Sequence, residues 1–199
     1  MLAIENVRER ILLAGLEAAT LHGIRGLSMA DVARRADLSR QTVYRHFPSK
    51  EMLVTELVRA QTIEVVEKVV YATAEVDDPR KALETAMRET LRLTREHPLL
   101  DRLMRAEPES LLPLITSDGG PVVSLVRSVV SEIVEQKMPE LPALGSRRLS
   151  DVVTRLLISY ALNAPDDPPE TVAEFVAGFL AEGALATIPT HETVRAGTD

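Results

Sequence analysis

The sequence contains no cysteine and no tryptophan, and only six of its 199 residues are aromatic. The lack of cysteine excludes disulfides, thiolate catalysis and cysteine-ligated zinc, and it is typical of proteins in a reducing compartment. The four histidines, His22, His46, His97 and His191, stand far apart, so we expect no metal site and no cofactor. No apolar run approaches the ~20 residues that a membrane span requires, and the N-terminus lacks the apolar segment of a signal peptide. We therefore expect a cytoplasmic protein without a membrane partner.

Charge is distributed unevenly along the chain. The formal net charge is −7, from 23 basic and 30 acidic side chains. Residues 1–50 hold eight Lys or Arg against five Asp or Glu, a net +3, which leaves 15 − 25 = −10 for residues 51–199. Because a basic surface is the usual footprint of nucleic-acid binding, a polyanionic partner is compatible with the first fifty residues and is disfavoured for the rest.

Helical periodicity dominates the sequence, and no strand-like alternation interrupts it. Serines stand at N-cap positions before three helical segments, and Asp78 and Asp167 each precede a proline that suits the first helical position. Gly23 follows the last periodic residue of the first segment, where a left-handed residue commonly ends a helix. These signals predict an all-α protein of about nine helices, at residues 4–22, 29–36, 40–47, 49–73, 79–96, 98–106, 109–138 (broken near Gly119), 147–163 and 169–187.

Two short helical segments joined by only three residues predict a helix-turn-helix over about residues 28–47. Val43 and Phe47 are spaced i, i+4 and are expected to pack inward, which leaves the other side chains of the second helix outside. In such a motif the second helix enters the major groove of DNA, where Arg reads guanine, Gln reads adenine, and hydroxyls and helix N-termini hold phosphates. The predicted DNA-binding residues are Ser28, Met29, Ser39, Arg40, Gln41, Thr42, Tyr44, Arg45, His46 and Lys50.

A series of short motifs lies within residues 10–54, comprising Gly23, Ser28-Met29, Val32-Ala33-Arg34-Arg35-Ala36, Ser39, Thr42-Val43-Tyr44, His46-Phe47 and Ser49-Lys50-Glu51. With these motifs the segment closely resembles the DNA-binding region of the TetR/AcrR family of transcriptional regulators. The resemblance implies that Tyr44 and Lys50 contact phosphates and that the residues at 40, 41 and 42 lie at base edges. Three positions depart from the family pattern: Gly15 and Ala19 replace a usual alanine and phenylalanine, and Asp37 replaces a usual turn glycine.

The rest of the chain is predicted to form a second domain. We expect a helix-turn-helix domain over residues 1–48, a helical ligand-binding and dimerisation domain over 49–188, and a flexible tail over 189–199. The middle helices are aliphatic and poor in aromatics, which favours a fatty-acyl or other lipid-like effector between helices over a planar cation. The predicted ligand-binding residues are Met87, Leu91, Leu103, Met104, Leu112, Ile115, Leu125, Val126, Leu156 and Tyr160.

The last two predicted helices carry apolar residues over more than one face, which favours pairing with a second copy of the chain. The predicted dimerisation residues are Val152, Val153, Leu156, Tyr160, Phe175, Val176, Phe179 and Leu180. A two-fold symmetric dimer requires a pseudo-palindromic DNA operator.

Together these observations predict a homodimeric, ligand-responsive transcriptional regulator, foremost a repressor that a small hydrophobic molecule releases from double-stranded operator DNA. An activator of the same family fits the same residues. A ligand-sequestering helical module without DNA binding is a second alternative. An enzyme is disfavoured, because the sequence has no glycine-rich phosphate loop, no GxSxG motif and no histidine cluster.

Overall fold

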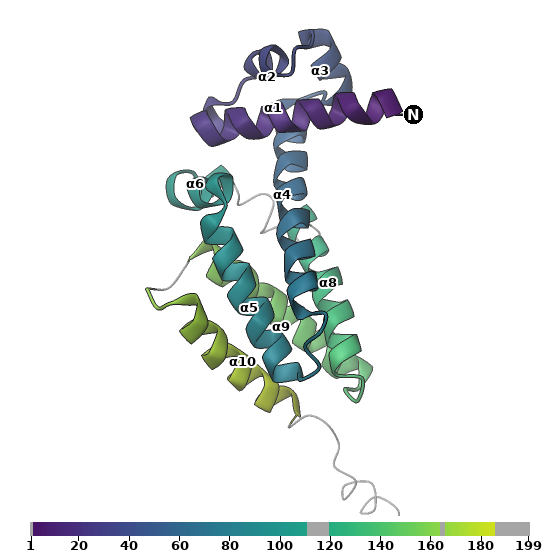
Figure 1. Ribbon diagram of the computed structural model, residues 1–199, viewed down its shortest axis with the longest axis vertical. Helices are drawn as coiled ribbons and strands as arrows, with labels where there is room; N and C mark the ends of the chain where they lie inside the picture. The colour runs from purple at the N-terminus through teal and green to yellow at the C-terminus, as the bar shows by residue number, and fades with distance from the viewer. Residues whose placement is uncertain (1, 111–119, 164–165, 186–199) are drawn as a thin grey trace, which may run out of the picture. The chain divides into compact units, whose positions relative to one another are not determined.

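The computed structural model describes residues 2–110, 120–163 and 166–185. Within these ranges, the helices of seven residues or more are α1 (Leu2–Gly26), α2 (Met29–Arg35), α3 (Arg40–His46), α4 (Lys50–Thr73), α5 (Pro79–Glu96), α6 (Pro98–Ala106), α8 (Pro121–Lys137), α9 (Ala143–Leu162) and α10 (Pro169–Leu185) (Figure 1). The all-α fold class predicted from the sequence is therefore confirmed. None of the helices in the described ranges is long and apolar enough to span a membrane.

The predicted N-caps explain where three of these helices begin. Each serine side chain accepts a hydrogen bond from the backbone N–H three residues further on, at 3.1–3.2 Å: Ser28 from Asp31, Ser39 from Thr42, and Ser49 from Met52. An N-cap oxygen of this kind satisfies one of the backbone donors that the first turn leaves unpaired. The starts of α2, α3 and α4 are thus fixed by local sequence.

Two predicted helix starts differ from the structure by more than two residues. The helix predicted at 147–163 begins earlier, because Ala143 follows Pro142 directly and Gly145 is part of the first turn. The ~1 kcal/mol cost of a helical glycine is offset by burial of the apolar residues that follow it. The helix predicted at 109–138 begins at Pro121 as α8, and residues 111–119 lie outside the described part of the chain.

The chain divides into two compact units. Unit 1 comprises Met1–Val65 and Thr94–Ser124, and unit 2 comprises Val66–Leu93 and Leu125–Asp199. This grouping differs from the predicted boundary after residue 48, because the first part of α4 and all of α6 belong to the same compact unit as α1 to α3.

In unit 1, α2 and α3 lie on one side of α1, and α6 lies on the other side near the C-terminal end of α1 (Figure 1). The core includes Ile11, Val32, Phe47, Leu53 and Leu57, all nearly fully buried. The departure at Gly15 has a packing reason here. A Cβ on that glycine would lie 3.1 Å from a methyl of Leu57, so the leucine fills the space that the usual alanine would take.

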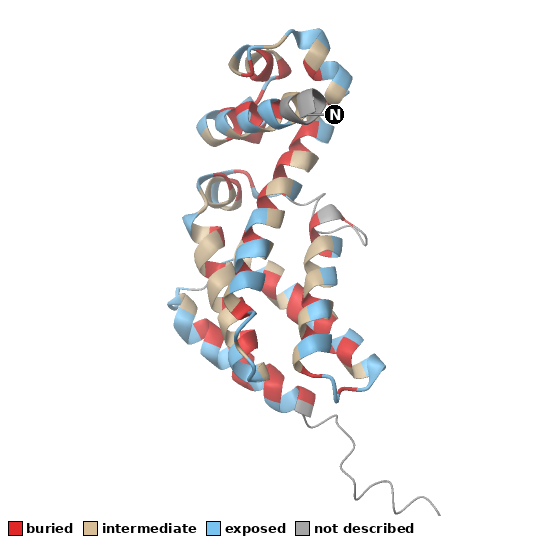
Figure 2. Ribbon diagram, turned by 45° about the vertical axis from the view of Figure 1, so that its right-hand side comes forward, coloured by how far each residue is buried: buried red, intermediate tan, exposed pale blue. Residues whose placement is uncertain are grey.

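In unit 2, a single aliphatic cluster joins α5, α8, α9 and α10. Buried and exposed residues alternate along α10, as expected of a helix with one face in the core (Figure 2). The cluster comprises Leu83, Met87, Leu91, Val130, Val134, Met138, Leu141, Leu149, Val153, Leu157, Val172, Ala173, Val176, Ala177, Leu180 and Ala184.

Candidate nucleic-acid interface

The turn between α2 and α3 depends on Asp37, whose φ of 52° is the one positive φ at a non-glycine residue in the described chain. Asp37 therefore adopts the left-handed backbone conformation at the turn position where the family pattern usually has glycine. Arg10 of α1 supports this turn, because its Nη2 donates to the carbonyl oxygens of Ala36 at 2.5 Å and of Asp37 at 3.4 Å. A guanidinium group at these carbonyls satisfies the C-terminal acceptors of α2 and interacts favourably with the negative end of the helix dipole.

Two buried residues orient α3. Val43 and Phe47 are 0% and 1% exposed, so the predicted inward pair is confirmed. The opposite side of the helix exposes Arg40, Gln41, Tyr44 and Arg45, while Thr42 and His46 are half-buried. Within the described residues, neither Arg40 nor Arg45 forms an ion pair. The helix therefore presents guanidinium, amide and hydroxyl groups on one side.

The predicted phosphate-contacting groups surround this face. Ser28 and Ser39 are exposed at the N-termini of α2 and α3, where backbone N–H groups also point outward. Lys50, at the start of α4, donates through Nζ to the carbonyl oxygen of Arg25 at 3.0 Å. Met29 differs from these residues, because its side chain is buried on the inward face of α2.

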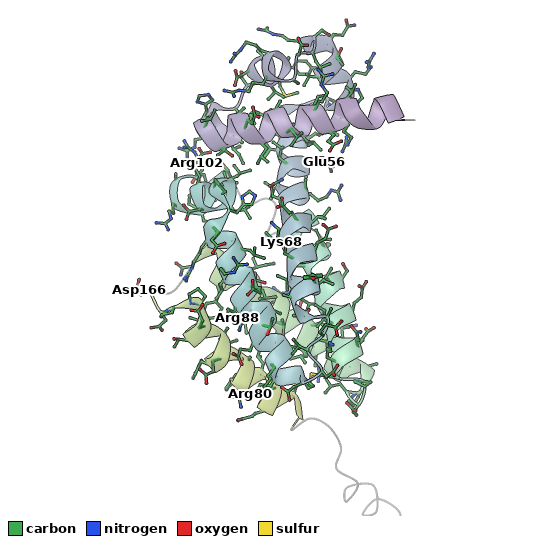
Figure 3. All side chains as sticks on the ribbon, viewed as in Figure 1. Glu56, Lys68, Arg80, Arg88, Arg102 and Asp166 are labelled. Atoms are coloured by element: carbon green, nitrogen blue, oxygen red, sulfur yellow. The ribbon has the colours of Figure 1, made fainter. Side chains whose placement is uncertain are left out.

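Several cations counted in the basic N-terminal region serve the fold. The Arg8 guanidinium lies 4.7 Å from the centroid of the Phe47 ring and forms an ion pair of 2.6 Å with Glu56 (labelled in Figure 3). This contact joins α1 to the end of α3 and to α4. In the sequence, Arg8 and Arg10 contribute only to the positive charge of the first fifty residues, and no local motif distinguishes them from DNA-facing arginines.

The acidic residue of α2 also reduces the free positive charge. Asp31 accepts from Arg34 and, at 2.8 Å, from Nε of Arg35. The hydrogen bond from Arg35, opposed by partial desolvation and helped by Arg34, holds the pKa of Asp31 below its ordinary value. The ionised carboxylate therefore offsets one of the two guanidinium charges beside it.

The predicted ligand-binding residues are divided between the units. Met87 and Leu91 are buried in the cluster of unit 2, and Val126, Leu156 and Tyr160 pack partly buried against it. Leu125 is half-buried in the same unit. Leu103 is fully buried and Met104 half-buried in unit 1, and Leu112 and Ile115 lie outside the described residues.

The predicted dimerisation residues separate into two groups. Val153, Val176 and Leu180 are buried within their own chain. Leu156 and Tyr160 pack partly buried against the same core. The remaining three are exposed: Val152 at 44%, Phe175 at 75% and Phe179 at 74%.

An apolar groove of about 390 Å³ lies in unit 2 beside two of these exposed residues. It runs between the first half of α9 and the end of α10, and among the described residues Arg148 is the one charged residue that lines it. The predicted ligand-binding residues that the structure describes do not line it. The lining residues are Leu141, Pro142, Leu144, Gly145, Arg148, Leu149, Val152, Phe179, Leu180, Gly183 and Ala184.

Comparison with known proteins places both parts of the chain in one family. Residues 11–57 match the family described as bacterial regulatory proteins, tetR family. Residues 78–182, more than half of the chain, match the family described as bacterial tetracyclin repressor, C-terminal domain.

Individual proteins agree with these matches. The chain is 26% identical over 184 residues to an uncharacterized HTH-type transcriptional regulator of Mycobacterium tuberculosis, covering 92% of this chain and 89% of that protein. It is 25% identical over 169 residues to the HTH-type transcriptional regulator AlkX of the same species, with 82% and 80% covered. The crystal structure of the TetR family repressor AlkX from a Dietzia strain has the same fold, with a TM-score of 0.73, 22% identity, and 90% and 98% of the two chains covered.

These matches confirm the family predicted from residues 10–54 and extend it to the C-terminal helices. Regulators of this family bind operator DNA and small-molecule effectors. The family is not enzymatic, so the prediction that the chain is not an enzyme is confirmed. The exposed face of α3 and the serine caps of α2 and α3 lie within the matched N-terminal region. Because the C-terminal helices match as well, the chain belongs to the TetR family of DNA-binding transcriptional regulators.

Proposed function

We propose that the protein is a homodimeric repressor that binds a pseudo-palindromic operator and leaves it when a lipid-like effector binds. The observation that carries the proposal is the face of α3, where buried Val43 and Phe47 hold exposed Arg40, Gln41 and Tyr44 outward. The relative named as a TetR family repressor supports the sign of regulation. In this proposal the residues of α3 read bases, and the groups around them hold phosphates.

Base-reading and phosphate-holding residues should respond differently to substitution. Lys50→Ala is expected to weaken binding to operator and scrambled DNA alike and to lower the slope of log Kd against log salt by about 1. Tyr44→Phe should weaken both by loss of one hydroxyl. Gln41→Ala is expected to cost about 1–3 kcal/mol on the operator alone, because the bidentate contact to adenine carries sequence information.

Gel shifts at several salt concentrations, on the operator and on a scrambled duplex, measure these differences. Lys81→Ala is the matched control for lost charge, because Lys81 is an exposed lysine of α5 in unit 2 and its loss should leave the DNA affinity unchanged. An equal loss on both duplexes for Gln41→Ala would contradict the base-reading role. A wild-type protein that retards no duplex from its own upstream region would contradict the repressor proposal as a whole.

The dimer proposal is supported by the exposed phenylalanines of unit 2. Phe175 and Phe179 lie one helical turn apart on α10, so they form one apolar ridge, and Val152 of α9 is also exposed. Two of the three phenylalanines in the sequence are thus exposed to solvent in the single chain. Burial against a second copy would remove this surface, and a dimer supplies two recognition helices for a two-fold symmetric operator.

The effector proposal is supported by the aliphatic cluster of unit 2, against which Tyr160 is the one aromatic side chain that packs among the described residues. A chain-like hydrophobic ligand suits such walls better than a planar aromatic cation, which favours aromatic cages. The Dietzia relative is implicated in biodegradation of n-alkanes, which agrees with an effector of this class.

Native mass spectrometry of the purified protein tests the effector class. We expect a bound fatty acid or similar lipid, and we expect added C12–C18 acids to raise the melting temperature and release the operator. Binding that stabilises the folded state at 100 times Kd adds about 2.7 kcal/mol. Leu91→Trp, which fills the cluster, should abolish both responses, whereas release only by planar aromatic compounds would contradict the proposed class.

A further inference from the structure

We propose that Glu107, at the C-terminal end of α6, is a positioning residue for DNA binding. Its carboxylate fixes the backbone of Arg25, and the carbonyl of Arg25 in turn holds Lys50 beside the recognition helix. The inference rests on the proposed operator binding and on the phosphate contact of Lys50.

The carboxylate of Glu107 is buried against the end of α1. Its residue is only 6% exposed, and its backbone N–H donates to the carbonyl of Leu103 at 3.0 Å, which closes α6. Oε2 accepts a hydrogen bond from the backbone N–H of Arg25 at 3.0 Å, between residues 82 positions apart in the chain. Because burying a carboxylate without a partner is costly, this bond ties α6 to the last turn of α1.

Gly23 provides the space for this carboxylate. The glycine interrupts α1 with φ 74° and ψ 171°, and a Cβ at this position would lie 1.7 Å from Oε1 of Glu107. The carboxylate therefore occupies the notch that the missing side chain leaves. Arg102, labelled in Figure 3 between α6 and the end of α1, lies beside the same notch.

The backbone carbonyl of Arg25 binds the ammonium group of Lys50. The carbonyl oxygen accepts from Nζ at 3.0 Å, so Arg25 is bonded to Glu107 through its N–H and to Lys50 through its C=O. A lysine ammonium has three donors, and one bond to a carbonyl leaves two for a phosphate. A lysine already restrained in this way loses less side-chain freedom when it meets DNA, which favours the bound state.

The same Arg25 backbone leads into the helix-turn-helix. Leu27 follows, nearly fully buried, and Ser28 then caps α2. The residue whose N–H is held by Glu107 therefore also carries the carbonyl that binds Lys50. A residue that only filled space in the core would not act selectively on this lysine.

The chain offers a matched control two residues away. Glu109 also contacts Arg25, but it pairs with the exposed guanidinium and leaves the backbone alone. Glu109→Ala thus removes the same charge from the same partner residue without touching the bonds that hold Lys50. Since exposed ion pairs contribute little, its effect on operator affinity is expected to stay within about twofold.

The experiment is a double-mutant cycle between Glu107 and Lys50, read as operator affinity at several salt concentrations. Glu107→Ala should weaken operator binding by about 10-fold and lower the salt slope by about 1, as Lys50→Ala does. In the Lys50→Ala background the same change should cost less than about twofold, because the residue it positions is gone. Glu107→Gln, whose amide oxygen still accepts from the N–H of Arg25, should restore most of the affinity.

Two results would overturn the inference if the wild type binds its operator. One is a double variant whose loss of affinity equals the product of the two single losses, and the other is a Glu107→Ala protein whose salt slope is unchanged. Failure of the wild type to bind any operator would overturn the proposed function first. If Glu107→Ala does not fold, Glu107→Asp replaces it in the cycle. The aspartate keeps the charge but withdraws the carboxylate by one methylene, so the same loss of affinity and slope is expected.

Discussion

Replacing Phe175 and Phe179 together with glutamate should convert the protein from dimer to monomer at micromolar concentration and abolish tight operator binding. Both side chains are about three-quarters exposed, although they are large and apolar. A buried aromatic residue at an interface commonly contributes 2 kcal/mol or more, and a two-fold interface counts each residue twice. Two substitutions therefore remove at least ~8 kcal/mol, which is more than five orders of magnitude in the dimer Kd.

Operator affinity should fall with the dimer. Each monomer retains its own recognition helix, so binding to one half-site persists, but the gain from engaging two half-sites together is lost. That gain is commonly about 10²–10⁴-fold. The double variant should therefore bind a full operator and an isolated half-site with similar, weak affinity.

Sedimentation equilibrium and gel shifts on full and half operators measure both effects. Tyr71→Glu is the matched control, because Tyr71 is an exposed aromatic of α4 that belongs to neither α9 nor α10. We expect it to remain dimeric with unchanged affinity. A double variant that stays dimeric, or a Tyr71→Glu protein that dissociates, would contradict the assignment of the dimer interface to Phe175 and Phe179.

The helix-turn-helix could be predicted closely because its determinants are local. A serine cap acts over three residues, and the inward pair of α3 over four, so both can be recognised without knowing the rest of the fold. The left-handed turn at Asp37 follows from the same short segment. Met29 shows the limit of motif matching, since it is buried with Val32 and Ala33 on the inward face of α2 although Ser28 beside it is exposed.

The C-terminal sites could be predicted only in part because periodicity marks apolar faces without saying what covers them. Val153 and Val176 carry the same signal as Val152 and Phe175, yet the first pair lies in the core and the second pair is exposed. The same holds for the predicted ligand-binding residues, since Leu103 is aliphatic like the others but is buried in the core of unit 1. Hydrophobicity alone does not distinguish a core, an interface and a cavity wall.

Contacts between distant segments could not be predicted from the sequence at all. Arg10 supports the turn from another helix, and Glu107 meets Arg25 across 82 positions of the chain. In the sequence both look like ordinary charged residues on helical surfaces. The Gly23 notch is an intermediate case: the glycine was predicted to end the first helix, but its second role, as space for a carboxylate, depends on α6.

That double role makes Gly23→Ala the second substitution with a large expected effect. The φ and ψ of Gly23 lie in a region that only glycine occupies readily, and forcing another residue there costs about 1–3 kcal/mol. The new methyl would also displace the Glu107 carboxylate from the N–H of Arg25, at a further ~1–3 kcal/mol for the bond that is lost. Together these costs are a large share of the 5–15 kcal/mol that stabilises a typical domain.

The two costs can be separated by combining Gly23→Ala with Glu107→Ala. Thermal unfolding should show Gly23→Ala lowering the melting temperature by about 2–4 °C for each kcal/mol lost. In the double variant the methyl meets no carboxylate, so Gly23→Ala adds only backbone strain to the loss caused by Glu107→Ala. The combined loss should therefore be smaller than the sum of the single losses by about 1–3 kcal/mol. Gly183→Ala is the control, because a Cβ there meets nothing within 4 Å and the residue lies inside α10, where alanine should be neutral or stabilising. Strictly additive losses would show that the carboxylate can leave the notch freely, and that backbone strain alone makes Gly23 necessary.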